Sequence, residues 1–494
     1  MHKTIIELNG GSVRGERCDG ICVFKGIPFA APPVGELRFA APQPPRPWAG
    51  VRDATRFAEP SVQMPRSVDD SAAATDVAVT IGAEDCLYLN IYTPLEPGPH
   101  PVLVWVHSGG AVEGSPSECD GASFAQHGVV VVTIAYRLGA LGLLYLPGVF
   151  EDQADCNFAL LDQIAALRWV QENIAAFDGD SRRVTLAGLS NGGRTVGNLL
   201  AAPSARGLFQ QAVSMSGTGV GYLVAKPDDA HRLTAAVLSE LGLDMSTARQ
   251  LRSIPAERIV AAQTRVSSSW PTLIPFQVVV DGTVMPERPI DAIARGVARD
   301  IAIIVGNTHD EYDYFHMGEG RWRRYGYRAM VVDASQLEQA TAAYRRLLPA
   351  DWSEEEVRRH AVTSADWWMP AIRLAEANIK AGGQAWVYRL DWRLAPRGHG
   401  FGAPHGLDVP LMSPNDPEYE SVMLAAARRD TSGLTTAIDA MRAALIRFID
   451  GGDPGVGDWP AYDIAARPTF LFDELSAVAE DPERELRLAW EQII

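Results

Sequence analysis

The stretch from Val184 to Leu200, VTLAGLSNGGRTVGNLL, constrains the fold of this chain more than any other. Val184 to Ala187 is predicted to be a short buried strand, and Arg194 to Leu200 the start of an apolar helix. Between them lies a G-x-S-x-G pentapeptide, which by itself is more often only a glycine-rich turn. With a strand before it and a helix after it, the pattern predicts a sharp reversal with a strained Ser190 at its apex. The glycines are needed because strand and helix pass too close for a Cβ.

Several other segments predict alternating strands and helices. Near-continuous apolar runs are typical of strands that are buried on both faces of a sheet. We expect strands at Ile21–Phe24, Leu87–Tyr92, Pro101–Val106, Val129–Ala135, Ile301–Val305, Ala385–Leu390 and Phe470–Phe472, and helices at Leu160–Ala175 and Ala437–Ile449. Residues 220–380 are richer in helical patterns. This alternation predicts an α/β fold with a large, mostly parallel central sheet flanked by helices.

The composition and the net charge limit the classes of molecule that this chain is expected to bind. Of the 494 residues, 47% are hydrophobic and 21% are charged, and the net charge is −17. An acidic chain of this kind disfavours nucleic acid and anionic membranes as partners. No apolar run approaches the ~18 residues of a membrane-spanning helix, and the N-terminus lacks the apolar segment of a signal peptide. The five cysteines form no disulfide framework. We therefore expect a cytoplasmic protein, of a subunit number that the sequence leaves open.

A nucleophilic serine needs a base and an acid, and the sequence offers several of each after Ser190. The candidate bases are His309, His316, His360, His399 and His405. His405 lies in GAPHGLD, and its flanking glycines favour a loop held close to other backbone; His399 in RGHGF is its rival. For the acid, Asp310 and Glu311 follow the predicted strand that ends at Val305. Carboxylates at such strand ends line the sites of open α/β sheets, and local chemistry does not choose between these two.

Backbone amides that hold an oxyanion have candidates at two places. His107, Ser108, Gly109 and Gly110 follow the strand Pro101–Val106, and two consecutive glycines let N–H groups turn into a site without obstruction. The second place is the amide of Asn191, at the start of the helix after Ser190. No spacing typical of metal ligands, such as H-E-x-x-H, occurs in the chain.

The motifs that resemble a known family run nearly from end to end. They are FKGIPFAAPPVGELRF at 24–39, EDCLYLNIYTP at 84–94, VWVHSGG at 104–110, AYRLGALG at 135–142, LDQIAALRWVQENIAAFDGD at 161–180, GLSNGG at 188–193, VVDG at 279–282, GNTHDE at 306–311, GAPHG at 402–406 and WPAYD at 459–463. The chain resembles the type-B carboxylesterases, which include bacterial para-nitrobenzyl esterases, liver carboxylesterases and cholinesterases. The resemblance implies the α/β-hydrolase fold in a single domain over residues 1–494, with insertions within about 220–380 that cap the active-site gorge.

The resemblance also implies the site. It places the catalytic triad on Ser190, Glu311 and His405, and the oxyanion amides on Gly109, Gly110 and Asn191. Leu189, Ile274, Phe276 and Phe315 are our candidate substrate-binding residues. The expected reaction is the hydrolysis of a small to medium, neutral carboxylic ester through an acyl-enzyme, without metal or organic cofactor. Two alternatives remain: the same chemistry on a carbamate, amide or lactone, and a non-catalytic binding protein on the same fold.

The sequence departs from the family pattern at positions near the serine. Leu189 stands where the family usually has glutamate, Asn191 where it has alanine, and Ser108 where it has glycine. Loss of the acid favours neutral substrates. The Asn191 side chain either bonds a neighbouring loop or contacts a polar substrate group. Cys86 corresponds to a cysteine that is paired in secreted relatives, and its partner position is Ser61 here, so we expect a free thiol. Residues 58–86 hold no aromatic residue, which disfavours choline esters.

Overall fold

The computed structural model describes residues 4–65, 79–150, 154–317, 327–396, 400–413, 427, 430–456 and 458–493. The chain forms two compact units whose segments alternate along the sequence. The first unit comprises residues 1–187, 198–210 and 224–288, and the second comprises 188–197, 211–223 and 289–494. One boundary falls between Ala187 and Gly188, just before Ser190, so the predicted turn belongs to the second unit.

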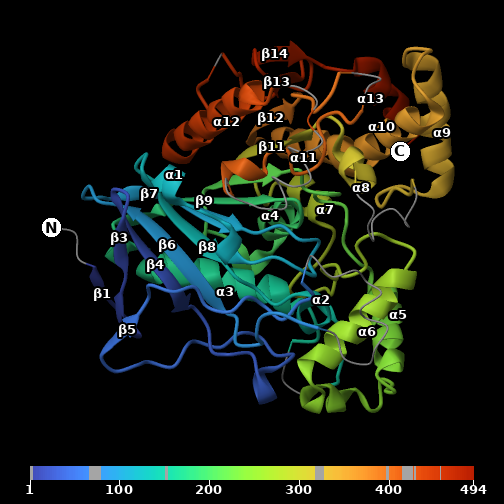
Figure 1. The fold of residues 1–494 in the computed structure, drawn as a ribbon. Coiled ribbons are helices and arrows are strands. Elements are labelled where there is room, and N and C mark those ends of the chain that lie inside the picture. Colours follow the sequence, from blue (N-terminus) through green and yellow to red (C-terminus); the bar gives the residue numbers. More distant parts are fainter. Residues whose placement is uncertain are drawn as a thin grey trace. The chain divides into compact units, whose positions relative to one another are not determined.

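The first unit contains strands in the order β9, β7, β8, β6, β4 and β3 (Figure 1). Their bounds are β3 (Glu16–Cys18), β4 (Ile21–Pro28), β6 (Tyr88–Pro94), β7 (His100–Val106), β8 (Val130–Ile134) and β9 (Gly179–Leu189). β7 and β8 are parallel, whereas β8, β6, β4 and β3 pair in antiparallel fashion. A small separate sheet holds β1 (Ile5–Leu8), β2 (Gly11–Arg14) and β5 (Val51–Asp53).

The helices of the first unit are α1 (Ala122–Ala125), α2 (Gly139–Leu143), α3 (Phe158–Asn173), α5 (Pro227–Glu240) and α6 (Ala256–Ser269). α2 contacts both α3 and α6, and α5 and α6 pack against each other (Figure 1). α3 carries a buried charge: its Asp162 accepts from the guanidinium of Arg137 at 2.7 Å. The pair is buried on both sides, so removing either partner would leave an uncompensated charge in the core.

The second unit is built on parallel strands. β10 (Gln211–Met215), β11 (Ala302–Thr308), β12 (Gln384–Leu390) and β13 (Pro468–Phe472) follow one another in space, and β14 (Ala477–Glu480) adds an antiparallel edge. The helices are α7 (Pro289–Ala294), α8 (Tyr314–Met317), α9 (Ala334–Leu347), α10 (Glu354–Thr363), α11 (Met369–Lys380), α12 (Ser432–Gly451) and α13 (Arg484–Glu491). α11 packs along β11 and β12, and α12 along β13 (Figure 1).

α4 (Asn191–Ala201) follows Ser190 directly and starts in the second unit. A π-helical segment, residues 364–368, joins α10 to α11. Rows of buried side chains explain the strands: every residue of β8 and all but the first of β11 are buried. The strands and helices predicted from apolar runs are confirmed, as is the helical character of residues 220–380 in its described part. The single-domain organisation and the capping role of those residues stay predictions.

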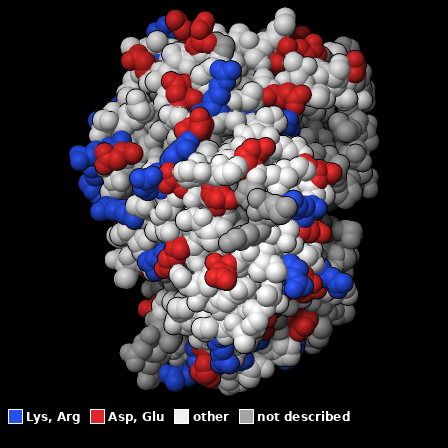
Figure 2. Space-filling model, turned by 90° about the vertical axis from the view of Figure 1, so that its left-hand side faces the viewer, with Lys and Arg blue, Asp and Glu red and all other residues white. Residues whose placement is uncertain are grey.

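Charge is not gathered by sign on the face shown in Figure 2. On the face shown in Figure 2, acidic and basic side chains are interspersed among neutral ones. The net charge of −17 therefore does not take the form of one acidic patch on that face. None of the helices in the described part of the chain has the length and hydropathy needed to span a bilayer. No disulfide joins any of the five cysteines.

Candidate active site

Ser190 lies at the apex of a strained turn between β9 and α4. Its φ angle is +59°, in the left-handed region that non-glycine residues rarely adopt. A Cβ on Gly188 would lie 2.6 Å from the carbonyl carbon of Gly192. The Ser190 amide donates to Met215 O at 2.9 Å, which ties the turn to the end of β10. The predicted reversal and the steric reason for its glycines are thus confirmed by the local geometry.

His405 stands between Ser190 and Glu311. Its Nδ1 forms a hydrogen bond with Glu311 Oε2, and its Nε2 lies 2.8 Å from Ser190 Oγ. A carboxylate can only accept, so Nδ1 carries the proton and Nε2 presents its lone pair to the serine. The second oxygen, Glu311 Oε1, accepts from Thr308 N at 2.8 Å. Glu311 is fully buried and His405 is 8% exposed, so the bond between these two side chains is shielded from water, whereas Ser190 is partly exposed.

Two further carboxylates tie the loop that carries Glu311 to the loop that carries His405. Asp310 Oδ2 accepts from Ala403 N at 2.9 Å and from the guanidinium of Arg393 at 2.6 Å. Asp313 Oδ2 accepts from Gly402 N at 2.7 Å. The two amides belong to the residues that lie three and two positions before His405. The structure therefore directs Glu311 to the imidazole and Asp310 to the backbone of the neighbouring loop.

The rival histidines lie elsewhere. His309 is held between Asp310 Oδ2, 3.0 Å from its Nδ1, and Glu483 Oε1, 3.2 Å from its Nε2. His360 is buried beside His309, and His316 stacks on a tyrosine ring at 4.7 Å. None of these three bonds Ser190. His399 lies outside the described residues.

His309, Asp310 and His360 are close enough to form a candidate metal site, because one donor atom from each lies within 4.8 Å of the others. The two rings are stacked, 5.3 Å apart and inclined by 29°, so their in-plane lone pairs do not converge on one ion. Asp310 Oδ2 already accepts from Arg393 and Ala403 N. Burial opposes a charge on His309, but Asp310 and Glu483 outweigh it and raise its pKa to about 9. The arrangement suits an imidazolium bridge between two carboxylates better than a metal.

Sequence reasoning missed Asp408, a buried acid close to Glu311 and His405. It is 1% exposed, and neither of its carboxylate oxygens has a hydrogen-bond partner among the described residues. Burial and the charge of Glu311 raise its pKa to about 7. For His405 itself, burial opposes protonation, but the charge and hydrogen bond of Glu311, together with Asp408, raise the pKa of the imidazole. The only indication of the role of Asp408 in the sequence is its position three residues after His405.

Aromatic rings surround the imidazole. The ring centroid of Phe315 lies 5.9 Å from that of His405, Trp367 5.8 Å and Tyr314 6.1 Å. Phe315 was predicted to contact substrate; it is 8% exposed and packs on the catalytic histidine candidate. Trp367 comes from the π-helical segment between α10 and α11. No local sequence motif predicts the contact of Trp367 with His405, because this contact depends on how distant segments of the chain fold together.

Leu189 and Asn191 flank Ser190 and are both buried. The Asn191 side chain accepts a hydrogen bond from the guanidinium of Arg194, one turn along α4. This internal partner favours the structural role for Asn191 over the contact with substrate. Leu189 presents no charge beside the serine. Its role as a substrate contact stays a prediction.

The other predicted residues belong to the first unit. Gly109 and Gly110 follow β7 with φ angles of +110° and +61°, and His107 stacks on Tyr136 at 4.3 Å. A Cβ on Gly109 would collide with the backbone of Glu113, so only glycine fits there. Ile274 and Phe276 are buried within the same unit. The assignment of the glycines to an oxyanion hole and of the two apolar residues to a substrate pocket stays a prediction.

Comparisons with known proteins show the family to which the chain belongs. The model of the carboxylesterase family matches residues 2–484. The chain belongs to the carboxylesterase family. It is 34% identical to the para-nitrobenzyl esterase of Bacillus subtilis, over 99% of this chain and 98% of that one. It is 33% identical to the fumonisin B1 esterase of Sphingopyxis macrogoltabida, over 93% of this chain and 85% of that one.

Solved structures of carboxylesterases share the fold. A carboxylesterase of Geobacillus stearothermophilus superposes with a TM-score of 0.84 at 35% identity, over 99% of this chain and all of that one. A para-nitrobenzyl esterase gives a TM-score of 0.82 at 33% identity, over 98% and 99% of the two chains. The predicted α/β-hydrolase fold is therefore confirmed, with antiparallel strands that make its sheet mixed. This carboxylesterase is a hydrolase of carboxylic esters, and its substrate is a small-molecule ester.

Proposed function

We propose that this carboxylesterase hydrolyses small to medium, neutral esters through a catalytic triad of Ser190, Glu311 and His405. One observation carries the proposal: His405 makes contacts at both ring nitrogens, with Glu311 Oε2 at Nδ1 and with Ser190 Oγ, 2.8 Å away, at Nε2. That is the arrangement in which an imidazole can take a proton from a hydroxyl while its own cation is stabilised.

The reaction follows from these positions. Ser190 Oγ attacks the ester carbonyl carbon as its proton passes to His405 Nε2, and Glu311 stabilises the imidazolium. The oxyanion is held by the amide of Asn191 at the start of α4 and, from the family pattern, by the amides of Gly109 and Gly110. His405 then gives its proton to the leaving alkoxide, which departs as the alcohol. Water attacks the acyl-enzyme, His405 takes its proton, and the acid leaves as Ser190 regains a proton.

The preference for neutral esters rests on the surroundings of Ser190. Leu189, beside the serine, is apolar and 5% exposed, so no carboxylate stands there to attract a cationic substrate. We also infer a single domain with capping elements within residues 220–380, and activity in the cytoplasm without nucleic-acid or membrane partners. The location is supported by the absence of any disulfide among the five cysteines, Cys86 included.

Labelling with a serine-reactive fluorophosphonate tests the nucleophile directly. We expect a single adduct on the peptide that contains Ser190, with loss of activity in proportion to labelling. A panel of neutral and cationic aryl esters, amides, carbamates and lactones tests the substrate class. We expect the highest kcat/KM on neutral esters. Labelling at another serine, or faster turnover of amides than of esters, would contradict the proposal.

A further inference from the structure

A chain of buried charges connects the residue before α13 to the loop that carries Glu311. Glu483 directly precedes α13, and its Oε1 forms a hydrogen bond of 3.2 Å with His309 Nε2. On the other side of the ring, His309 Nδ1 forms an ion pair with Asp310 Oδ2 at 3.0 Å. His309 is 4% exposed and Asp310 is 9% exposed. The imidazole of His309 therefore lies between two carboxylates that come from distant parts of the chain.

Contacts at both ring nitrogens of His309 require the charged form of the side chain. A neutral imidazole has one N–H, so its other nitrogen would direct a lone pair at a carboxylate oxygen. Although burial opposes a charge, Asp310, together with Glu483, outweighs it and raises the pKa of His309 to about 9. At neutral pH the ring is thus a buried cation. Its removal would leave the two carboxylates without the charge that joins them.

The Glu483 end of this chain of charges is fixed by two other elements. Arg389, on β12, donates to Glu483 Oε2 at 3.1 Å and to Asp391 Oδ1 at 2.6 Å. His360, on α10, lies with its Nε2 3.3 Å from Glu483 Oε1. The ring centroids of His360 and His309 are 5.3 Å apart. Glu483 therefore holds His309 against groups that do not belong to the Glu311 loop.

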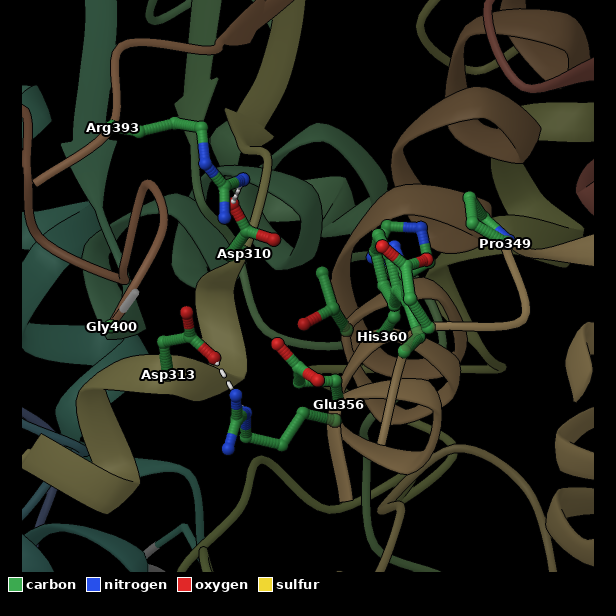
Figure 3. A pocket seen from close by; sticks show the side chains of 11 residues that line it. Asp310, Asp313, Pro349, Glu356, His360, Arg393 and Gly400 are labelled. Atoms are coloured by element: carbon green, nitrogen blue, oxygen red, sulfur yellow. Dashed lines mark hydrogen bonds and ion pairs between the residues drawn. The ribbon is translucent and has the colours of Figure 1, made fainter. Parts of the chain in front are cut away.

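The Asp310 end reaches the loop that carries His405. Arg393 donates to Asp310 Oδ2 at 2.6 Å, along the dashed line in Figure 3. The same oxygen accepts from Ala403 N at 2.9 Å. The amide of His405 donates to the carbonyl oxygen of Glu311 at 3.1 Å. Because Asp310 directly precedes Glu311, a displacement of the Asp310 side chain would disturb both loops.

We propose that His309 and Glu483 are positioning residues for catalysis: the cation of His309, anchored on Glu483, fixes the loop that places Glu311 against His405. This inference rests on the proposed function, and neither residue needs to contact the substrate. Proton transfer between Ser190 Oγ and His405 depends on their placement to within a fraction of an ångström. His405 acts in both acylation and deacylation, so a loosened loop slows both steps, lowering kcat with little change in KM.

The test is a double-mutant cycle of His309→Gln and Glu483→Gln in the full-length enzyme, with kcat and KM measured on a neutral aryl ester at room temperature. Glu483→Gln removes the charge and keeps the side-chain length and an acceptor for His309 Nε2. Since a misplacement of 1 Å costs about 100-fold in rate, we expect a smaller shift to lower kcat about ten-fold in His309→Gln and about three-fold in Glu483→Gln. Because Glu483 acts through His309, Glu483→Gln should cause no further loss in the double variant.

The matched control is Glu485→Gln, which removes the same charge from an exposed residue in the first turn of α13. We expect this control to keep the wild-type kcat. Thermal midpoints are measured in parallel, because a purely structural role would lower the midpoints of the two test variants and leave kcat unchanged. That result, or a further three-fold loss of kcat in the double variant, overturns the inference. If His309→Gln does not fold, kcat of Glu483→Gln against that of Glu485→Gln decides, and equal values overturn it.

The rate of fluorophosphonate labelling separates this inference from the proposed function. We expect the label on Ser190 in every variant, with a rate constant about ten-fold lower in His309→Gln, because the reagent reports how well the serine is activated. Labelling of the wild type at another serine overturns the proposed function and this inference with it. Labelling at Ser190 with equal rate constants in the wild type and His309→Gln overturns this inference alone.

Discussion

Replacing the buried acid Asp408 by asparagine is predicted to make the enzyme gain stability on the wild type as the pH rises. In the folded enzyme this carboxyl is buried without a hydrogen-bond partner among the described residues, and its pKa is raised from 3.8 to about 7. A carboxyl with a raised pKa holds its proton in the folded state at pH values where the unfolded chain has released it. Its contribution to stability is therefore fully present below pH 3.8 and is lost as the pH rises through about 7.

The size of the effect follows from linkage. One pKa unit corresponds to about 1.4 kcal/mol, so the shift of Asp408 costs the folded state about 4 kcal/mol above pH 7. Between pH 5 and pH 8 alone the cost grows by roughly 2.5 kcal/mol. Asp408→Asn removes this dependence, although its buried amide carries a constant cost of about 1–3 kcal/mol if unpaired. The change in the free energy of unfolding between pH 5 and pH 8 does not contain that constant cost.

The assay compares midpoints of thermal unfolding of Asp408→Asn and wild type at pH 5 and pH 8. For a chain of this length roughly 1 kcal/mol corresponds to about 1 °C, so the variant should gain about 2–3 °C on the wild type as the pH rises. Asp439→Asn is the control, because that side chain is 63% exposed on α12 and should show no such gain. Parallel behaviour of Asp408→Asn and wild type at both pH values would refute the reasoning and mean that Asp408 is ionised with a partner such as a buried water.

The same substitution and four others make predictions about activity. Asp408→Asn should move the acid limb of the kcat/KM profile to lower pH, because the charge of Asp408 helps to raise the pKa of His405, which must be neutral to act as a base. Ser190→Ala should retain the wild-type thermal midpoint and leave only the ~10³–10⁴-fold acceleration over water that binding and an oxyanion hole supply, measured by ester turnover. Glu311→Gln should lower kcat by a large factor, on the order of 10⁴, since an amide no longer stabilises the imidazolium; Asp310→Asn should lower it less, and the reverse order would mean that Asp310 is the acid. Asn191→Ala should lower the thermal midpoint, because the Asn191 side chain already bonds Arg194. For the same reason it should change kcat/KM for polar and apolar aryl esters by the same factor. A selective loss on polar esters would show a substrate contact.

The parts of the site that were predictable from sequence are those fixed by local sterics or by a two-sided apolar pattern. A Cβ on Gly188 would lie 2.6 Å from the carbonyl carbon of Gly192, and only glycine tolerates that approach at position 188, so the pentapeptide itself predicts the turn. β8 and β11 are buried along almost their whole length, and most of their residues therefore form near-continuous apolar runs in the sequence. β14 was not predicted, because its four residues are only half-buried at an edge and alternate weakly.

The long-range ion pairs of the site have no comparable pattern in the sequence. Arg393 reaches Asp310 from 83 residues away, and Glu483 reaches His309 from 174 residues away. Charged residues of this kind are usually solvated, and only the fold decides which of them become buried and paired. The aromatic contact of Trp367 with His405 has the same origin, since it depends on the path of the π-helical segment that precedes α11.

The different partners of the adjacent acids Asp310 and Glu311 explain why local chemistry could not choose the acid of the proposed triad. Successive side chains of a chain leaving a strand point to different sides. One carboxylate can therefore meet the imidazole of His405, while its neighbour turns to the backbone of the same histidine loop, accepting from Ala403 N at 2.9 Å. Ion pairs with His309 and Arg393 keep Asp310 charged and away from the imidazole of His405. A glutamate alone would have its loop free to shift by the fraction of an ångström that separates a good proton-transfer geometry from a poor one. The expected loss in Asp310→Asn is accordingly smaller than in Glu311→Gln but greater than for an exposed acid, because it loosens the loop that presents His405 rather than removing the charge that stabilises it.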